Sequence, residues 1–206
     1  MHPSEVLYED NHIIIINKRS SDIVQGDKTG DVPLSEIVKK YIKEKYKKPG
    51  DVYLGVVHRL DRPVSGAVIF ARTSKALTRL NEMIRDRKID KMYWAVTAGM
   101  PPGNEGHLTH YLKKNQKKNT SHAFAEPGEG RLKAELRYHF LFSSDNYNLL
   151  EVALLTGRHH QIRVQLANIG CVIKGDLKYG ANRANKNASI HLHARKISLM
   201  HPVKKE

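Results

Sequence analysis

The chain has 206 residues, of which 40% are hydrophobic, and its 35 Lys and Arg against 21 Asp and Glu give a net charge of +14. This length fits one domain or at most two small ones, and the composition excludes a disordered tail. The charge attracts polyanions, and nucleic acid is the commonest of these, although a basic protein without a nucleic-acid partner stays open. An anionic membrane surface fits less well, because no basic amphipathic anchor is evident.

The cysteine content and the apolar runs indicate the cellular compartment in which the protein is expected to lie. Cys171 is the only cysteine, so no intramolecular disulfide can form, which suits a reducing environment. The first residues lead into no apolar leader segment, and no apolar run is long enough to span a bilayer. We therefore expect a cytoplasmic protein without a membrane partner.

The first third of the chain alternates strands, a loop and a helix. Short strands are expected over residues 6–10 and 12–17, and residues 18–33 form a polar loop that could face a ligand. Apolar residues at helical spacing predict a helix from Leu34 to Lys48. Its opposite face is rich in lysine, and this face either keeps the surface soluble or borders a nucleic-acid backbone.

The stretch Val57–Gly66 and the apolar run after it are the most informative part of the chain. Asp61 stands between Arg59 and Arg62, and Pro63 and Gly66 predict a turn that leads into a buried strand over residues 67–71. From these residues alone two interpretations stay open. Asp61 either bonds its own turn and pairs with a neighbouring Arg, or presents its carboxylate for chemistry.

The middle of the chain predicts a helix and further strands. A helix is expected from a cap at Thr73 or Ser74 to about Arg87, followed by a strand over residues 91–98. Residues 103–131 contain few apolar residues, and we expect a mobile basic excursion that only a partner orders. Alternating patterns over residues 133–140 and 147–155 predict neighbouring antiparallel strands.

The last quarter predicts a helix between a possible N-cap at Thr156 and a possible C-terminal glycine at Gly170. Residues 175–180 predict a turn, and residues 190–199 are expected to form either a helix or a strand. No repeat or linker divides the chain. We therefore predict one α+β domain over residues 1–206, with a mixed, mostly antiparallel sheet and flanking helices.

Several kinds of chemistry find no support in the motifs. The chain lacks a phosphate-binding loop and a dinucleotide fingerprint, so no nucleotide cofactor is expected. The histidines lack metal-site spacing, and Ser65 does not lie in a nucleophile elbow. The side chains that remain as candidates for chemistry are a carboxylate, several arginines and Tyr93. An Asp beside an Arg has a lowered pKa and stays ionised at neutral pH, so it can act as a nucleophile if it is dry and well aimed.

Ordered motifs over roughly residues 5–203 resemble the RluA family of RNA pseudouridine synthases. The matching motifs are His58-Arg59-Leu60-Asp61-Arg62-x-x-Ser65-Gly66, Lys91-x-Tyr93-x-Ala95, Thr156-Gly157-Arg158-x-His160-Gln161-Ile162-Arg163, Gly175-Asp176-x-x-Tyr179-Gly180 and Leu192-His193-Ala194 with His201-Pro202. The resemblance implies the pseudouridine synthase catalytic fold with a basic central cleft that holds Asp61. It also implies isomerisation of uridine in RNA to pseudouridine without a cofactor, and the histidine spacing above leads us to expect no metal.

The resemblance further implies roles for single residues. Asp61 matches the catalytic aspartate, and attack on the sugar C1′, attack on uracil C6 and elimination to a glycal all stay open as its route. Tyr93 matches the tyrosine that stacks on the flipped base and can take part in proton transfer. Arg163 matches the arginine that pairs with the catalytic carboxylate. Arg59 matches the residue that fills the space left by the flipped nucleotide, and a plain phosphate contact is its alternative.

The expected partner is ribosomal or transfer RNA, bound by a monomer. Its RNA-binding candidates are Arg59, Arg62, Lys113, Lys114, Lys117, Lys118, Arg158 and His160. Because the catalytic pattern begins within the first ten residues, we expect a stand-alone catalytic domain without the S4-like RNA-binding domain of many relatives. Two other functions stay open, a non-catalytic RNA-binding protein that keeps the fold and a metal-dependent nuclease that uses the histidines.

Overall fold

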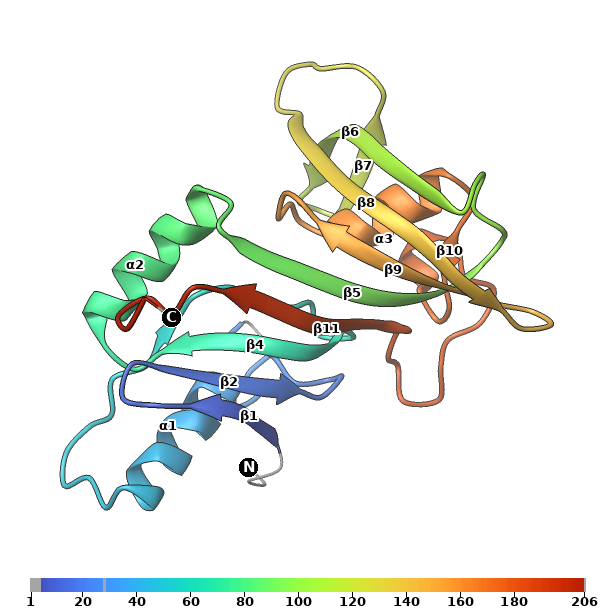
Figure 1. Ribbon diagram of the computed structural model, residues 1–206. Coiled ribbons are helices and arrows are strands. Elements are labelled where there is room, and N and C mark those ends of the chain that lie inside the picture. Colours follow the sequence, from blue (N-terminus) through green and yellow to red (C-terminus); the bar gives the residue numbers. More distant parts are fainter. Residues whose placement is uncertain (1–4, 28, 206) are drawn as a thin grey trace. The chain divides into compact units, whose positions relative to one another are not determined.

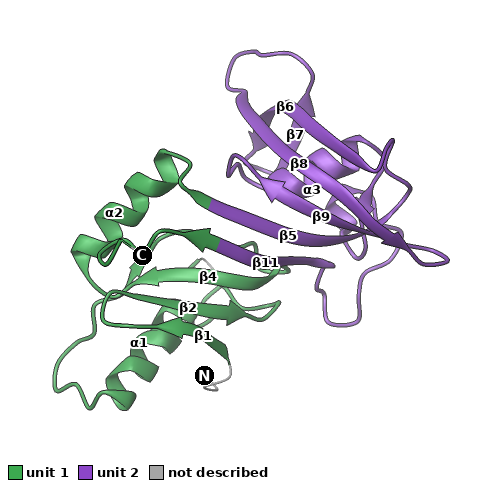
Figure 2. Cartoon of the chain, in the orientation of Figure 1, with its two compact units in different colours: residues 1–89, 198–206 green, residues 90–197 purple. Residues whose placement is uncertain are grey.

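The computed structural model describes residues 5–27 and 29–205, so the ends of the predicted domain and Lys28 of the predicted loop lie outside the described residues. The chain divides into two compact units (Figures 1 and 2). Unit 1 comprises residues 1–89 and 198–206, and unit 2 comprises residues 90–197. Helices and strands combine as the predicted α+β class, and every strand pairing given below is antiparallel.

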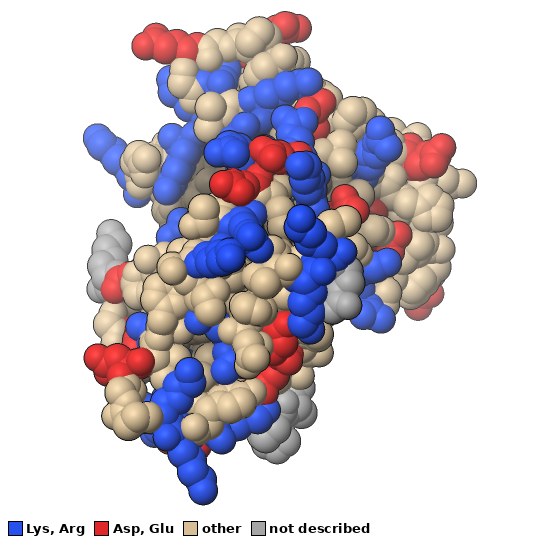
Figure 3. All heavy atoms as spheres, turned by 60° about the vertical axis from the view of Figure 1, so that its left-hand side comes forward, with Lys and Arg blue, Asp and Glu red and all other residues tan. Residues whose placement is uncertain are grey.

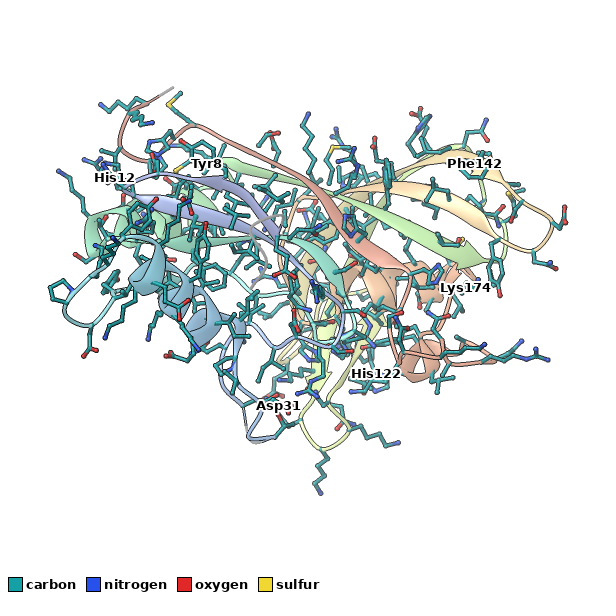
Figure 4. The ribbon with its side chains drawn as sticks, turned by 90° about the horizontal axis from the view of Figure 1, so that it is seen from below. Tyr8, His12, Asp31, His122, Phe142 and Lys174 are labelled. Atoms are coloured by element: carbon teal, nitrogen blue, oxygen red, sulfur yellow. The ribbon has the colours of Figure 1, made fainter. Side chains whose placement is uncertain are left out.

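Unit 1 contains short strands and two helices, close to the predicted bounds. They are β1 (Val6–Glu9), β2 (Ile13–Lys18), α1 (Leu34–Lys45), β3 (Gly55–Val56), β4 (Ser65–Ala71) and α2 (Ser74–Arg85). Strand β2 pairs with β1 and β4, and β3 also pairs with β4. The β1–β2 turn is closed by Asp10. Its Oδ1 accepts hydrogen bonds from the backbone N–H groups of His12 at 2.8 Å and of Ile13 at 2.9 Å, and His12 is labelled in Figure 4.

The apolar run that predicted a buried strand forms the centre of unit 1. Val68, Ile69 and Phe70 of β4 are all fully buried, although successive side chains point to opposite faces of a strand. Both faces of β4 are therefore covered, and each such side chain contributes about 1.5–3 kcal/mol of burial free energy. Helix α2 begins where predicted, because Thr73 Oγ1 accepts a hydrogen bond from the Ala76 N–H at 3.1 Å.

Unit 2 is built mainly of strands. Its elements are β5 (Ile89–Ala98), β6 (Glu105–Asn115), β7 (Thr120–Phe124), β8 (Leu132–Ser143), β9 (Asn148–Leu154), α3 (Gln161–Asn168), β10 (Val172–Ile173), a 3₁₀ helix (Leu177–Tyr179) and β11 (Leu192–Leu199). The first residue of β5 and the last two residues of β11 belong to unit 1. The strands follow one another in the order β5-β9-β8-β6-β7, and β10 pairs with β5. Residues 190–199, for which a helix or a strand was open, thus contain a strand.

The expectation of a mobile excursion over residues 103–131 is wrong. Strand β6 pairs with β8 from Glu105 to Leu112, and it then pairs with β7 as a hairpin (Figure 1). Backbone hydrogen bonds to a neighbouring strand do not depend on apolar side chains, so a polar sequence can be ordered in this way. The low apolar content of residues 103–131 therefore led to the wrong expectation.

Helix α3 starts later than predicted. Thr156 is not its N-cap. Instead the cap position is His160, whose φ of 54° places it in the left-handed region. The prediction for the other end is confirmed, because Gly170 has a φ of 81° and donates to Ala167 O at 3.0 Å, while Cys171 N donates to Leu166 O at 2.9 Å. This pair of bonds is the Schellman motif that commonly ends helices at glycine.

Candidate active site

Asp61 lies on a turn with buried anchors on both sides. The Val64 N–H donates to Asp61 O at 3.0 Å and closes the turn, while Leu60 and Val64 are both buried. The Asp61 side chain is partly exposed. A stiff turn with buried neighbours on either side therefore holds this carboxylate where a ligand can reach it.

A buried lysine holds the same turn from within unit 1. The Lys18 side chain is 1% exposed, and its Nζ donates to the backbone carbonyls of Arg19 (2.8 Å), Arg62 (3.1 Å) and Val64 (2.7 Å). Burial lowers the pKa of Lys18 to about 8, and the negative charges of Asp22 and Asp61 partly oppose this shift. Lys18 is still mostly protonated at neutral pH, so two of its three hydrogen bonds fix the backbone at Arg62 and Val64, just after Asp61. The sequence analysis did not single out Lys18, because a lysine at the end of a strand is usually exposed.

The arginines beside Asp61 differ in their surroundings. Arg62 forms an ion pair with Asp31 (labelled in Figure 4), and its Nη2 donates to Thr29 Oγ1 at 3.1 Å. These contacts connect the polar loop after β2 to the Asp61 turn. The Arg59 side chain is exposed, which leaves it available to a partner.

Tyr93 lies in the middle of β5, on the buried face of the strand. It is 6% exposed and pairs in register with Val152 of β9. The strand alternates, so Lys91, Tyr93 and Ala95 share this face while Trp94 points to the opposite one. The predicted strand placed Tyr93 correctly.

Arg163 is fixed by the carboxylate of Asp176, which belongs to a matched motif but was assigned no role from the sequence. Its Nε donates to Asp176 Oδ2 at 2.7 Å and its Nη2 to Asp176 Oδ1 at 2.8 Å, and the two side chains are 4% and 1% exposed. This two-pronged geometry is the strongest kind of Arg–carboxylate contact. The guanidinium also lies over the Tyr179 ring, 5.1 Å from its centroid. The expected pairing of Arg163 with Asp61 stays a prediction.

The Tyr179 hydroxyl connects the β6–β7 hairpin to the start of α3. It accepts a hydrogen bond from the Ser121 N–H at 2.8 Å, and it lies 2.8 Å from His160 Nδ1. Ser121 Oγ also donates to His159 O at 2.8 Å, and the rings of His159 and His160 stack with centroids 3.8 Å apart. The ring that packs against Arg163 is thus joined directly to the hairpin.

The predicted RNA-binding residues divide into exposed and buried ones. Lys113 and Lys114 in β6 and Lys117 and Lys118 in the following turn are exposed, on the strand pair that includes His122 (labelled in Figure 4). Arg158 is also exposed, and its Nε donates to Lys133 O at 3.0 Å.

His160, by contrast, is only 8% exposed, so its hydrogen bond to Tyr179 favours a role in shaping the loop. On the face drawn in Figure 3, Lys and Arg side chains are widespread, with smaller groups of Asp and Glu between them.

The described residues contain neither a metal-binding cluster nor a membrane-spanning helix. Within residues 5–27 and 29–205, no group of three or more His, Cys, Asp or Glu side chains is arranged to hold a metal ion. In the same part of the chain, no helix is long and apolar enough to cross a bilayer.

Comparison with known proteins identifies the family. The family model for RNA pseudouridylate synthase matches residues 12–168. The chain is 33% identical to ribosomal large subunit pseudouridine synthase C of Buchnera aphidicola subsp. Schizaphis graminum, over 97% of this chain and 63% of the relative. It is 29% identical to ribosomal large subunit pseudouridine synthase D of Zymomonas mobilis, over 98% of this chain and 66% of the relative. The chain thus spans less than two thirds of the length of either relative.

Solved structures show the same fold. Human RNA Pseudouridylate Synthase Domain Containing 4 superposes with a TM-score of 0.81 at 23% identity, over 95% of this chain and 84% of that chain. Human RNA Pseudouridylate Synthase Domain Containing 1 gives a TM-score of 0.70 at 21% identity, over 98% and 80%. The α+β pseudouridine synthase fold and the family expected from the motifs are therefore confirmed, and the basic central cleft stays a prediction. Since the family model covers more than half of its residues, this chain belongs to the RNA pseudouridylate synthase family.

Proposed function

We propose that this chain isomerises uridine to pseudouridine in RNA, with Asp61 as the catalytic carboxylate and without a cofactor. The observation that carries the proposal is the family match over residues 12–168, which includes Asp61, Tyr93 and Arg163. The names of both relatives above point to ribosomal RNA of the large subunit as the substrate, and transfer RNA is the alternative. We further propose that residues 1–206 act as one catalytic domain, as a monomer in the cytoplasm.

The reaction requires a base that is turned out of the RNA. The N1–C1′ bond breaks, the uracil rotates and C5 joins C1′, so that C5 loses a proton and N1 gains one. Extruding the base costs a few kcal/mol, which stacking on an aromatic ring such as Tyr93 offsets. Asp61 supplies the carboxylate from a turn that Lys18 immobilises. We assign to Arg163 the permanent positive charge that stabilises this carboxylate, a pairing that rests on the family motifs alone.

RNA backbone contacts come from exposed cations. We assign them to Arg59, Arg62, Arg158 and the four lysines of the β6–β7 hairpin, all of which are exposed. Each phosphate neutralised in this way releases counterions, so the slope of log affinity against log salt changes by about 0.9 per contact for duplex nucleic acid and about 0.7 for single strands. Replacing Lys117 and Lys118 together by Ala is expected to reduce that slope by about 1.5.

Tritium release tests the proposed activity. RNA transcribed with uridine labelled at C5 releases tritium when C5 becomes the point of attachment to the sugar. Wild-type protein is expected to release label, and Asp61→Ala is expected to release none above background. A non-catalytic RNA-binding protein would instead bind this RNA in a salt-dependent way and release no label. Equal release by both variants would remove Asp61 from the mechanism.

A further inference from the structure

Lys91 lies beside the predicted base-stacking residue, on the same face of β5. Two residues along a strand span about 7 Å, so Lys91 and Tyr93 are near neighbours on that face. The side chain of Lys91 is partly buried, and Nζ lies 3.8 Å from the position that a β-carbon at residue 157 would occupy. That residue is Gly157, so no side chain covers the ammonium group from this direction.

The charge of Lys91 has no partner among the residues that the structure describes. Among residues 5–27 and 29–205, Nζ makes no hydrogen bond or ion pair. Burial lowers the pKa of Lys91, and no neighbouring carboxylate opposes that shift. Lys18 and Arg163, two fully buried cations among the described residues, both have close oxygen partners. A partly buried cation without a counter-charge costs stability, which indicates that its anion comes from outside the chain.

We propose that Lys91 binds a phosphodiester group of the RNA at the target nucleotide. This inference rests on the proposed function, in which Tyr93 stacks on the base of that nucleotide. RNA carries its negative charge only on phosphates, and Lys91 lies only about 7 Å along the strand from the residue that stacks on the base. Gly157, the residue that leaves Nζ uncovered, belongs to the loop that leads into α3 and Arg163.

Three variants test this proposal. Lys91→Met keeps the length of the side chain without its charge, and Lys91→Arg keeps the charge. Lys196→Met is the matched control, since it removes the same charge from an exposed position in β11 of the same unit. RNA affinity is measured across a range of salt concentrations with unmodified large-subunit ribosomal RNA transcribed in vitro. Thermal unfolding and tritium release are measured for each variant.

The expected result separates binding from folding. Lys91→Met is expected to bind RNA roughly tenfold more weakly at low salt, with a salt slope lower by about one, and to release tritium more slowly. Its melting temperature is expected to equal or exceed that of wild type, because a buried unpaired charge has been removed. Lys91→Arg is expected to retain most of the affinity.

Two results would overturn the inference. One is a Lys91→Met variant that keeps the affinity and the salt slope of wild type. The other is a variant that melts at a lower temperature with an unchanged salt slope, which would make Lys91 a packing residue. Failure of the proposed function would be recognised separately, because wild-type protein itself would then release no tritium.

Discussion

Each unit of this protein contains a fully buried cation at or beside the proposed active site, Lys18 in unit 1 and Arg163 in unit 2, and the two have different partners. In unit 1 the Lys18 ammonium donates to backbone carbonyls, which carry no net charge. In unit 2 the Arg163 guanidinium is paired with the Asp176 carboxylate. Lys18 therefore has a pKa lowered to about 8, whereas a guanidinium stays charged at any ordinary pH.

The difference indicates what each cation does. Lys18 binds main-chain oxygens on either side of Pro63, so its effect is to fix the backbone of the turn that carries Asp61. Arg163 is itself the side chain being fixed, since Asp176 determines the orientation of its planar group. Lys18 thus fixes the backbone next to the Asp61 carboxylate, whereas Arg163 is itself oriented by the Asp176 carboxylate.

The largest expected effect on stability comes from breaking the pair in unit 2. Asp176→Asn keeps the volume of the side chain but leaves the Arg163 charge buried without its counter-charge. We expect the free energy of unfolding to fall by about 3–5 kcal/mol, measured by chemical denaturation.

Asp86→Asn is the matched control, because it breaks the exposed pairs of Asp86 with Arg85 and Lys88. Exposed pairs contribute little, so this variant should unfold like wild type. Equal unfolding free energies for the Asp176→Asn variant and wild type would contradict the assigned role of the buried pair.

A smaller effect, and one that depends on pH, is expected for unit 1. The pKa of Lys18 is about 8 in the folded protein against an ordinary value of 10.5, so between these values the unfolded chain binds more protons. Stability contributed by Lys18 should therefore rise with pH from about 8 to 10.5, by an amount on the order of 3 kcal/mol.

Lys18→Met isolates this contribution. The difference in unfolding free energy between wild type and Lys18→Met should change across that pH window and stay constant between pH 6 and 7.5. A difference that is flat up to pH 10.5 would show that the ammonium is not desolvated as the geometry indicates.

The smallest expected effect concerns the link between Arg163 and the hairpin. Tyr179→Phe keeps the ring under the guanidinium but removes the hydroxyl that accepts from the Ser121 N–H. We expect a loss of about 0.5–1.5 kcal/mol in local stability, seen as faster hydrogen exchange of the Ser121 amide. The matched control Tyr53→Phe changes an exposed ring and should leave that exchange unaltered. Unchanged protection of Ser121 in the Tyr179→Phe variant would contradict the link.

The sequence revealed those features that local patterns determine. Apolar periodicity located β4, α2 and β5, and the Gly170 helix end followed from its conformational freedom. It could not reveal contacts between distant residues. The pairing of β6 with β8, the bond from Lys18 to Val64 and the ion pair of Arg163 with Asp176 join segments that no spacing rule connects. The Thr156 prediction failed for a related reason, because the Thr156 hydroxyl bonds to the side chain of Gln161 and to the distant residue Glu135.

Pseudouridine mapping in cells tests the central claim most directly. Ribosomal and transfer RNA would be compared from cells that carry the wild-type gene, a deletion of the gene and an Asp61→Asn allele expressed at the wild-type level. We predict at least one uridine that is converted to pseudouridine only by the wild-type allele. An identical modification map in all three strains would contradict the proposed activity, and a site that persists with Asp61→Asn but not with the deletion would contradict the role of Asp61.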